Sequence, residues 1–240
     1  MNKAKIHLFF IPGLNQNPES FSLLAKFLQE SLFQKDIETD FSIYEYREDL
    51  ELSKRLHDLK NRISEIQNQG HEVIPIGFSL GSLLLSLAQS KQHLNFKKSI
   101  YLSPAFFIPK HSYVPKYLFK ALPLKSLVSF QSPEYANKRF TSRSLYQNLY
   151  DGLSEFDPDQ LLSLSHAKLI VVSPKDELVD SKKMKKAFLG KENIEVVPFS
   201  FKPKIYPYSR HLLFCPKNMS EEAFENLLRT VGKFLIRESN

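Results

Sequence analysis

The chain has 240 residues, which is enough for one large domain with a sizeable core. Hydrophobic residues make up 42% and charged residues 25%, and this balance excludes global disorder. The net charge is +7, but acidic residues are interspersed among the basic ones, so we expect no nucleic-acid partner. No segment approaches the roughly 18 to 20 apolar residues of a transmembrane helix, so none is expected.

The cysteine content and the first residues bear on location. Cys215 is the single cysteine, which excludes an internal disulfide and fits a reducing compartment. The apolar run at residues 6–11 is short, contains His7 and lacks a small-residue cleavage site, so we interpret it as a strand rather than a signal peptide. These features predict a cytoplasmic protein.

Strands and helices are predicted to alternate along the first hundred residues. Apolar runs predict strands, and apolar residues at three- and four-residue spacing predict helices. The expected strands are residues 5–11, 41–46, 71–78 and 97–103, and the expected helices are residues 19–33, 52–70 and 82–88.

The alternation breaks after residue 103. Residues 104–158 are rich in aromatic residues and proline, with two helical pieces at residues 113–121 and 141–150. The alternation then resumes, with strands at residues 168–173 and 194–199, helices at residues 181–188 and 220–237, and a loop at residues 200–211. This pattern predicts an α/β protein with a mostly parallel sheet. The insertion is expected over the carboxyl ends of the strands, where such sheets bind ligands.

Gly77-Phe78-Ser79-Leu80-Gly81 matches the pattern G-x-S-x-G between a predicted strand and a predicted helix. In this context the pattern is typical of a nucleophile elbow, a strained turn that projects a serine hydroxyl from the edge of a sheet. Glycine is needed on either side because strand and helix approach closely there. Ser79 is therefore the candidate nucleophile.

A nucleophilic serine needs a base and an acid that orients the base. In this architecture they follow in the order serine, acid, histidine, each in a loop after a strand. Asp176 follows the strand at residues 168–173 and is the favoured acid, with Glu177 and Asp180 as alternatives in the same loop. Asp180 also suits an N-cap of the next helix. Among the seven histidines, His211 has the required position after the last strand.

An acyl-transfer site also needs donors for the oxyanion. One donor is expected to be the backbone N–H of Leu80, at the start of a helix whose dipole favours negative charge. The second is expected from the loop after the first strand. That loop begins Pro12-Gly13-Leu14, and the N–H of Leu14 is the candidate.

The segments IPGLNQNPESF, GFSLG, SPKDELV and SRHLLF together resemble the α/β-hydrolase superfamily, above all small serine esterases and lipases related to carboxylesterases and monoacylglycerol lipases. The resemblance implies one α/β-hydrolase domain over residues 1–240: a mostly parallel sheet flanked by helices. Residues 104–158 would form a helical cap inserted after the strand that follows the nucleophile helix. It implies cleavage of a small-molecule carboxylic ester through an acyl-enzyme, with no metal or organic cofactor.

The expected cap, residues 104–158, is predicted to determine which substrate binds. Phe106, Phe107 and Tyr117 are candidate contacts for an apolar acyl group, and interleaved lysines suit weak contact with a membrane surface. Two alternatives stay open. The same three residues serve thioesterases and acyltransferases, and a hydrolase fold can also act as a non-catalytic binding protein. The sequence does not determine the oligomeric state.

Overall fold

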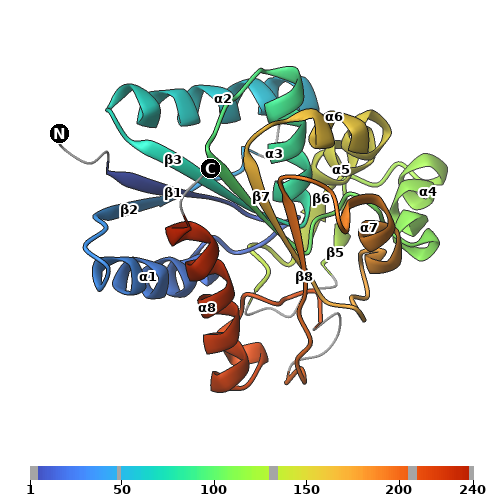
Figure 1. The fold of residues 1–240 in the computed structure, drawn as a ribbon. Helices are drawn as coiled ribbons and strands as arrows, with labels where there is room; N and C mark the ends of the chain where they lie inside the picture. Colours follow the sequence, from blue (N-terminus) through green and yellow to red (C-terminus); the bar gives the residue numbers. More distant parts are fainter. Residues whose placement is uncertain (1–4, 48–49, 130–134, 205–209, 238–240) are drawn as a thin grey trace.

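The computed structural model describes residues 5–47, 50–129, 135–204 and 210–237. Within these residues, six parallel strands form the main sheet in the order β2-β1-β3-β4-β7-β8 (Figure 1). The strands are β1 (Ile6–Ile11), β2 (Thr39–Ile43), β3 (Glu72–Phe78), β4 (Lys98–Leu102), β7 (Ala167–Val172) and β8 (Ile194–Pro198). Because β3 is interior to this order, the turn after it lies near the middle of the carboxyl edge.

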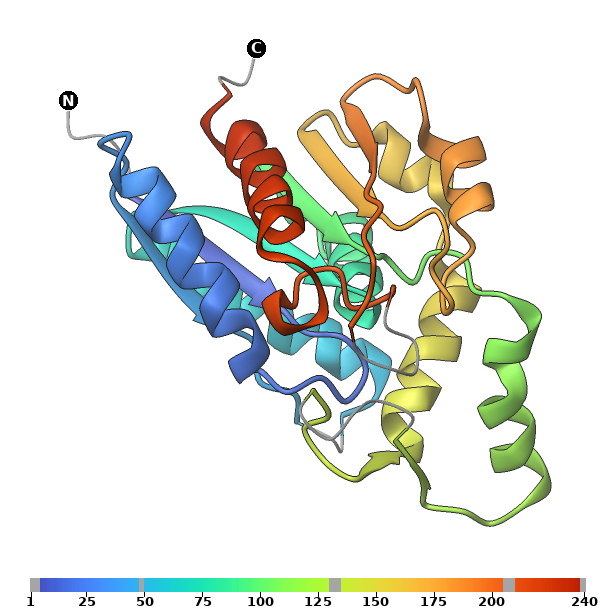
Figure 2. The same cartoon turned by 90° about the horizontal axis from the view of Figure 1, so that it is seen from below.

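Helices cover both faces of the sheet (Figures 1 and 2). One face carries α1 (Glu19–Phe33) and α8 (Glu221–Ile236). The other carries α2 (Leu52–Asn68), α3 (Leu80–Lys91) and α7 (Ser181–Phe188). A parallel sheet needs this double cover because its strands are apolar on both sides. Along β1, Leu8 and Phe10 pack toward α1, while Phe9 and Ile11 pack on the opposite side.

The chain between β4 and β7 holds the insertion. It contains the 3₁₀ helix η1 (Lys110–Tyr113), α4 (Val114–Ala121), β5 (Ser126–Val128), β6 (Phe140–Ser142), α5 (Arg143–Glu155) and α6 (Pro158–Ser163). The two helices predicted here are present as α4 and α5. The antiparallel pair β5–β6 and the helix α6 were not predicted, since elements of three to six residues carry too little periodicity to identify. Residues 130–134 of the insertion and 205–209 of the predicted loop lie outside the described residues.

The predicted elements of the sheet framework are confirmed with small shifts. The ranges of α1 and α7 are those expected from the sequence. The second strand was predicted at residues 41–46, but β2 occupies Thr39–Ile43. The reason is tertiary, since Thr39 pairs with Ile6 at the start of β1 and this register determines where β2 begins.

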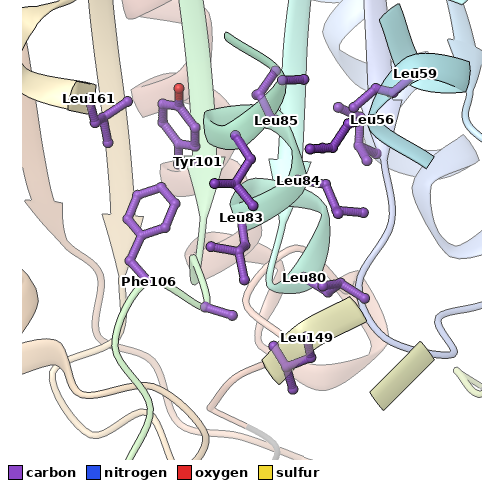
Figure 3. Packing of buried hydrophobic residues seen from close by; sticks show 14 of the residues in the cluster. Leu56, Leu59, Leu80, Leu83, Leu84, Leu85, Tyr101, Phe106, Leu149 and Leu161 are labelled. Carbon is purple, nitrogen blue, oxygen red and sulfur yellow. The ribbon is translucent and has the colours of Figure 1, made fainter. Parts of the chain in front are cut away.

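The helix α3, which follows the turn at Ser79, is buried along most of its length. Residues 80–89 are all buried, as expected of a helix that is apolar on nearly every side. Figure 3 shows Leu83, Leu84 and Leu85 of α3 among side chains from neighbouring elements, including Leu56 of α2 and Tyr101 of β4. This packing fixes the start of α3, and therefore the turn that precedes it, relative to the sheet.

Candidate active site

Ser79 occupies a strained turn between β3 and α3. Its backbone has φ of 51° and ψ of −114°, an unfavourable conformation for a residue with a Cβ. The flanking glycines allow the turn. A Cβ on Gly77 would lie 2.6 Å from the Cα of Ser82, and a Cβ on Gly81 would lie 2.0 Å from the carbonyl oxygen of Ile11. The turn therefore has the geometry expected of a nucleophile elbow.

The ring of His211 connects Ser79 to Asp176. His211 Nε2 lies 2.9 Å from Ser79 Oγ. His211 Nδ1 lies 3.0 Å from each carboxylate oxygen of Asp176. The side chains of Asp176 and His211 are 0% and 3% exposed, so little water competes for these bonds. A histidine held in this way can accept a proton from the serine hydroxyl while the carboxylate orients the ring.

The other acids of the loop after β7 have different partners. Asp180 accepts a hydrogen bond from the backbone N–H of Lys183 and is the N-cap of α7, as predicted. Glu177 pairs with Arg210, with Oε1 3.1 Å from Nη1, and also accepts from the Arg210 backbone N–H. Glu177 thus holds Arg210, the residue before His211, in place through both its side chain and its backbone. Among these three acids, Asp176 is the one that reaches the histidine.

Asp176 is itself held in place by the backbone. Its Oδ1 accepts hydrogen bonds from the N–H groups of Leu178 and Val179, at 2.9 and 3.1 Å. These donors stabilise the ionised carboxylate and orient it toward His211. The main chain of the loop after β7 therefore holds the Asp176 carboxylate in place.

The two candidate oxyanion donors belong to residues that line one cavity with Ser79. Leu80 is the first residue of α3, so its N–H has no partner within the helix. Leu14 belongs to the loop after β1. In that loop the Tyr46 hydroxyl donates to the carbonyl oxygen of Pro12 at 2.5 Å. Burial raises the pKa of Tyr46, which keeps this hydroxyl protonated as a donor.

The loop after β1 is also fastened to the insertion, a feature that the sequence did not reveal. The side chain of Asn15 donates to the carbonyl oxygen of Lys138 at 2.7 Å and accepts from the Lys138 N–H at 3.2 Å. The Asn15 carbonyl accepts from the N–H of Asn137 at 2.7 Å. Asn15 is 4% exposed and has φ of 50°, a conformation that asparagine tolerates better than most residues.

A cavity of about 370 Å³ opens from Ser79 and His211 toward the insertion. Its wall is mainly apolar, with contributions from Ile108, Val114, Leu118 and Leu149. Val114 and Leu118 are 52% and 37% exposed, so they lie at the rim. Their spacing of four residues on an amphipathic helix is the sequence signal that could have identified them.

The three aromatic residues expected to contact substrate lie elsewhere. Phe106 is buried in the core, stacked on Phe156 with ring centroids 4.5 Å apart, and Figure 3 shows it beside Tyr101. Phe107 packs against Phe156 and Phe188. Tyr117 is 65% exposed on α4. None of the three lines the cavity, because the segment after β4 turns them toward α7 or solvent.

Comparisons by sequence identify no relatives. No family model matches the chain, and no curated protein matches it. Among the described residues, no helix combines the length and the apolar character needed to cross a bilayer.

Solved structures do resemble this fold. A monoglyceride lipase from Saccharomyces cerevisiae, solved with a substrate analogue, superposes with a TM-score of 0.71 at 12% identity, covering 98% of this chain and 87% of that one. Est1E from Butyrivibrio proteoclasticus, solved with ferulic acid, gives 0.67 at 18% identity, with 98% and 90% covered. A monoacylglycerol lipase from Paleococcus ferrophilus gives 0.67 at 14% identity, with 97% and 95% covered. With its parallel sheet and flanking helices, the chain has the α/β-hydrolase fold of these esterases and lipases.

Proposed function

We propose that this protein is a serine hydrolase that cleaves carboxylic esters. The observation that carries the proposal is the ring of His211, which lies within hydrogen-bond distance of both Ser79 Oγ and the Asp176 carboxylate. Lipases and esterases among the structural neighbours support the same chemistry. Fold alone does not determine activity, so the argument rests on the site.

The mechanism is acyl transfer in two steps. Ser79 Oγ attacks the ester carbonyl while His211 Nε2 takes the hydroxyl proton, and Asp176 stabilises the resulting imidazolium. The N–H groups of Leu14 and Leu80 stabilise the oxyanion. His211 then protonates the leaving alcohol, and the acyl group stays on Ser79. Water attacks the acyl-enzyme and gives its proton to His211, which releases the acid and restores Ser79. The mechanism uses no metal or organic cofactor.

The cavity supports an apolar acyl group as the substrate moiety. Its volume of about 370 Å³ lies in the range of small-molecule sites, and its wall is mainly aliphatic. Burying a methylene of the substrate stabilises its binding by about 0.8 kcal/mol. We therefore expect kcat/KM to rise with acyl length until the cavity is filled.

A chain-length series of p-nitrophenyl esters tests the activity and the acyl preference together. We expect turnover that increases beyond acetate and a loss of about 10⁶-fold in kcat for Ser79→Ala. The fold should persist in that variant, as judged by circular dichroism. Equal turnover by Ser79→Ala, or its labelling by a fluorophosphonate, would refute the role of Ser79. Fastest turnover on acetate would refute the apolar acyl preference.

Two controls separate the alternative functions. Acyl-thioesters of matched length should turn over more slowly than oxygen esters, and the reverse order would identify a thioesterase. A folded native chain that reacts with no serine-directed probe would indicate a non-catalytic binding protein.

The cytoplasmic location remains a prediction from the single cysteine, Cys215, which is buried and forms no disulfide.

A further inference from the structure

Three side chains of types that can bind a metal ion lie close together at the amino ends of the strands, away from the candidate active site. His7 is in β1, Asp40 is in β2, and His71 directly precedes β3. These strands are parallel neighbours, with His7 paired to Asp40 and Ile6 paired to Glu72. The three side chains are therefore gathered at the amino ends of the strands, whereas Ser79 follows the carboxyl end of β3.

The donor atoms of this His7–Asp40–His71 cluster are close enough to share one ion. One nitrogen of each histidine and one carboxylate oxygen of Asp40 all lie within 4.8 Å of one another. Ligands about 2.0 to 2.2 Å from a tetrahedral zinc ion lie about 3.3 Å apart. Side-chain rotations that bring these atoms closer together by up to about 1.5 Å would produce this spacing. The ring centroids of His7 and His71 are 5.7 Å apart, in an edge-on arrangement.

One ring nitrogen of His71 lacks a hydrogen-bond partner among the described residues. Nδ1 of His71 is buried from solvent and has no partner among the residues that the structure describes. A buried polar atom without a partner is costly and rare in folded proteins. A metal ion would satisfy this nitrogen. The neighbouring histidine is oriented by a second residue, since His7 Nε2 lies 2.8 Å from Ser42 Oγ, and such outer contacts are typical of metal-binding histidines.

The local charges are compatible with a divalent cation. Lys5 contacts Oδ2 of Asp40 at 2.9 Å and Glu38 at 2.8 Å, so Glu38 balances the charge of Lys5. The carboxylate of Asp40 has a second oxygen to offer as a ligand. Two imidazoles and one carboxylate are a ligand set suited to zinc and to other late first-row transition metals.

We propose that His7, Asp40 and His71 form a site for a divalent transition metal such as Zn²⁺, with water completing the coordination. The ion would join the amino ends of β1, β2 and β3. Because the site lies at the opposite edge of the sheet from Ser79, it is independent of the proposed ester hydrolysis and acts on stability.

Zinc binding to the full chain tests the proposal. After treatment with a chelator, the protein is titrated with Zn²⁺ in competition with a chromophoric chelator. We expect one saturable site per chain that also raises the Tm. His71→Gln and Asp40→Asn should each weaken binding about tenfold or more, whereas His57→Gln, on the exposed face of α2, should not. An unchanged affinity in both cluster variants, or no saturable site in the native chain, would overturn the proposal.

Two measurements do not depend on the folding of those variants. Co²⁺ bound to the native chain should show the visible absorption of a four- or five-coordinate site with nitrogen and oxygen ligands, and an octahedral spectrum would count against the cluster. His211→Ala should retain the zinc site. Loss of binding in that variant would place the ion at the His211–Asp176 pair and refute the cluster as its site.

Discussion

His211 illustrates how single residues define the candidate site. Its two ring nitrogens face different partners, Ser79 on one side and Asp176 on the other. Contact with the ring of Phe78, with centroids 5.0 Å apart, restricts the imidazole further. The orientation of the His211 ring is thus determined by one carboxylate and one aromatic neighbour. The carboxylate fixes the tautomer, since an ionised acid can only accept from Nδ1–H.

Asp176→Asn tests this orientation at the scale of the residue. An asparagine can present its amide to Nδ1 and favour the wrong tautomer, so we expect kcat for a p-nitrophenyl ester to fall about 10⁴-fold. The free energy of unfolding should change far less than activity does. Urea unfolding measures it beside the kinetics.

Asp180→Ala is the matched control in the same loop. It removes the N-cap of α7 and should lower the free energy of unfolding by about 1 kcal/mol while leaving kcat near the native value. If Asp176→Asn lost tenfold or less of kcat while Asp180→Ala lost much more, Asp176 would not be the acid that orients His211.

Among the elements, the loop after β1 is joined by hydrogen bonds to the segment of the insertion that precedes β6. The side-chain amide of Asn15 donates through its nitrogen to the Lys138 carbonyl and accepts through its oxygen from the Lys138 N–H. The N–H of Asn17 donates to the carbonyl oxygen of Tyr135 at 2.7 Å. Leu14, the candidate oxyanion donor, directly precedes Asn15. We therefore expect a displacement of the insertion to shift the backbone near Leu14, and small displacements of a group that contacts the reacting atoms strongly affect the rate.

Replacement of Asn15 tests this connection. Asn15→Gly removes the side chain but accepts the positive φ, whereas Asn15→Ala also adds backbone strain. We expect both to lower kcat by up to about 100-fold with little change in KM, because an oxyanion donor acts on the transition state.

The matched control is Asn17→Ala. The Asn17 side chain accepts from the N–H of Glu19 at the start of α1, so its loss should affect stability rather than kcat. If Asn15→Gly raised KM and left kcat unchanged, Asn15 would contribute to substrate binding and not to the oxyanion loop.

At the scale of the whole molecule, the sheet separates a candidate active site at its carboxyl edge from buried polar groups at its amino edge. His166 precedes β7 and contacts Ser99 Oγ at 2.9 Å and Gln89 Nε2 at 3.2 Å. Burial and then the charge of Lys168 lower the pKa of His166 from 6.5 to about 4. The folded state therefore favours the neutral ring.

This lowered pKa predicts a loss of stability in acid. Between pH 6.5 and pH 4 the unfolded chain binds the proton more readily, so stability from His166 is complete above pH 6.5 and falls as the pH approaches 4. The shift corresponds to about 3 kcal/mol of unfolding free energy. Urea unfolding at pH 7.0 and pH 4.5 should show a smaller decline for His166→Gln than for the native chain. Equal declines would contradict the prediction, and His93→Gln, at an exposed position, should decline like the native chain.

Local sequence patterns predict the alternation of strands and helices, the turn around Ser79 and the chain order of Ser79, Asp176 and His211. These features depend on local periodicity and on residues adjacent in the chain, so they can be predicted without knowledge of the tertiary packing. The ranges of α1 and α7 follow from apolar spacing alone.

Contacts between residues far apart in the chain are visible only in the folded structure. His211 meets Asp176 across 35 residues and Ser79 across 132, and Asn15 meets Lys138 across 123. Phe106 has the apolar, aromatic side chain expected of a substrate contact but lies in the core, while Val114 and Leu118 line the cavity. Which side chain faces the cavity depends on how the insertion packs over the sheet, and that arrangement follows from the sum of many weak contacts rather than from any local pattern.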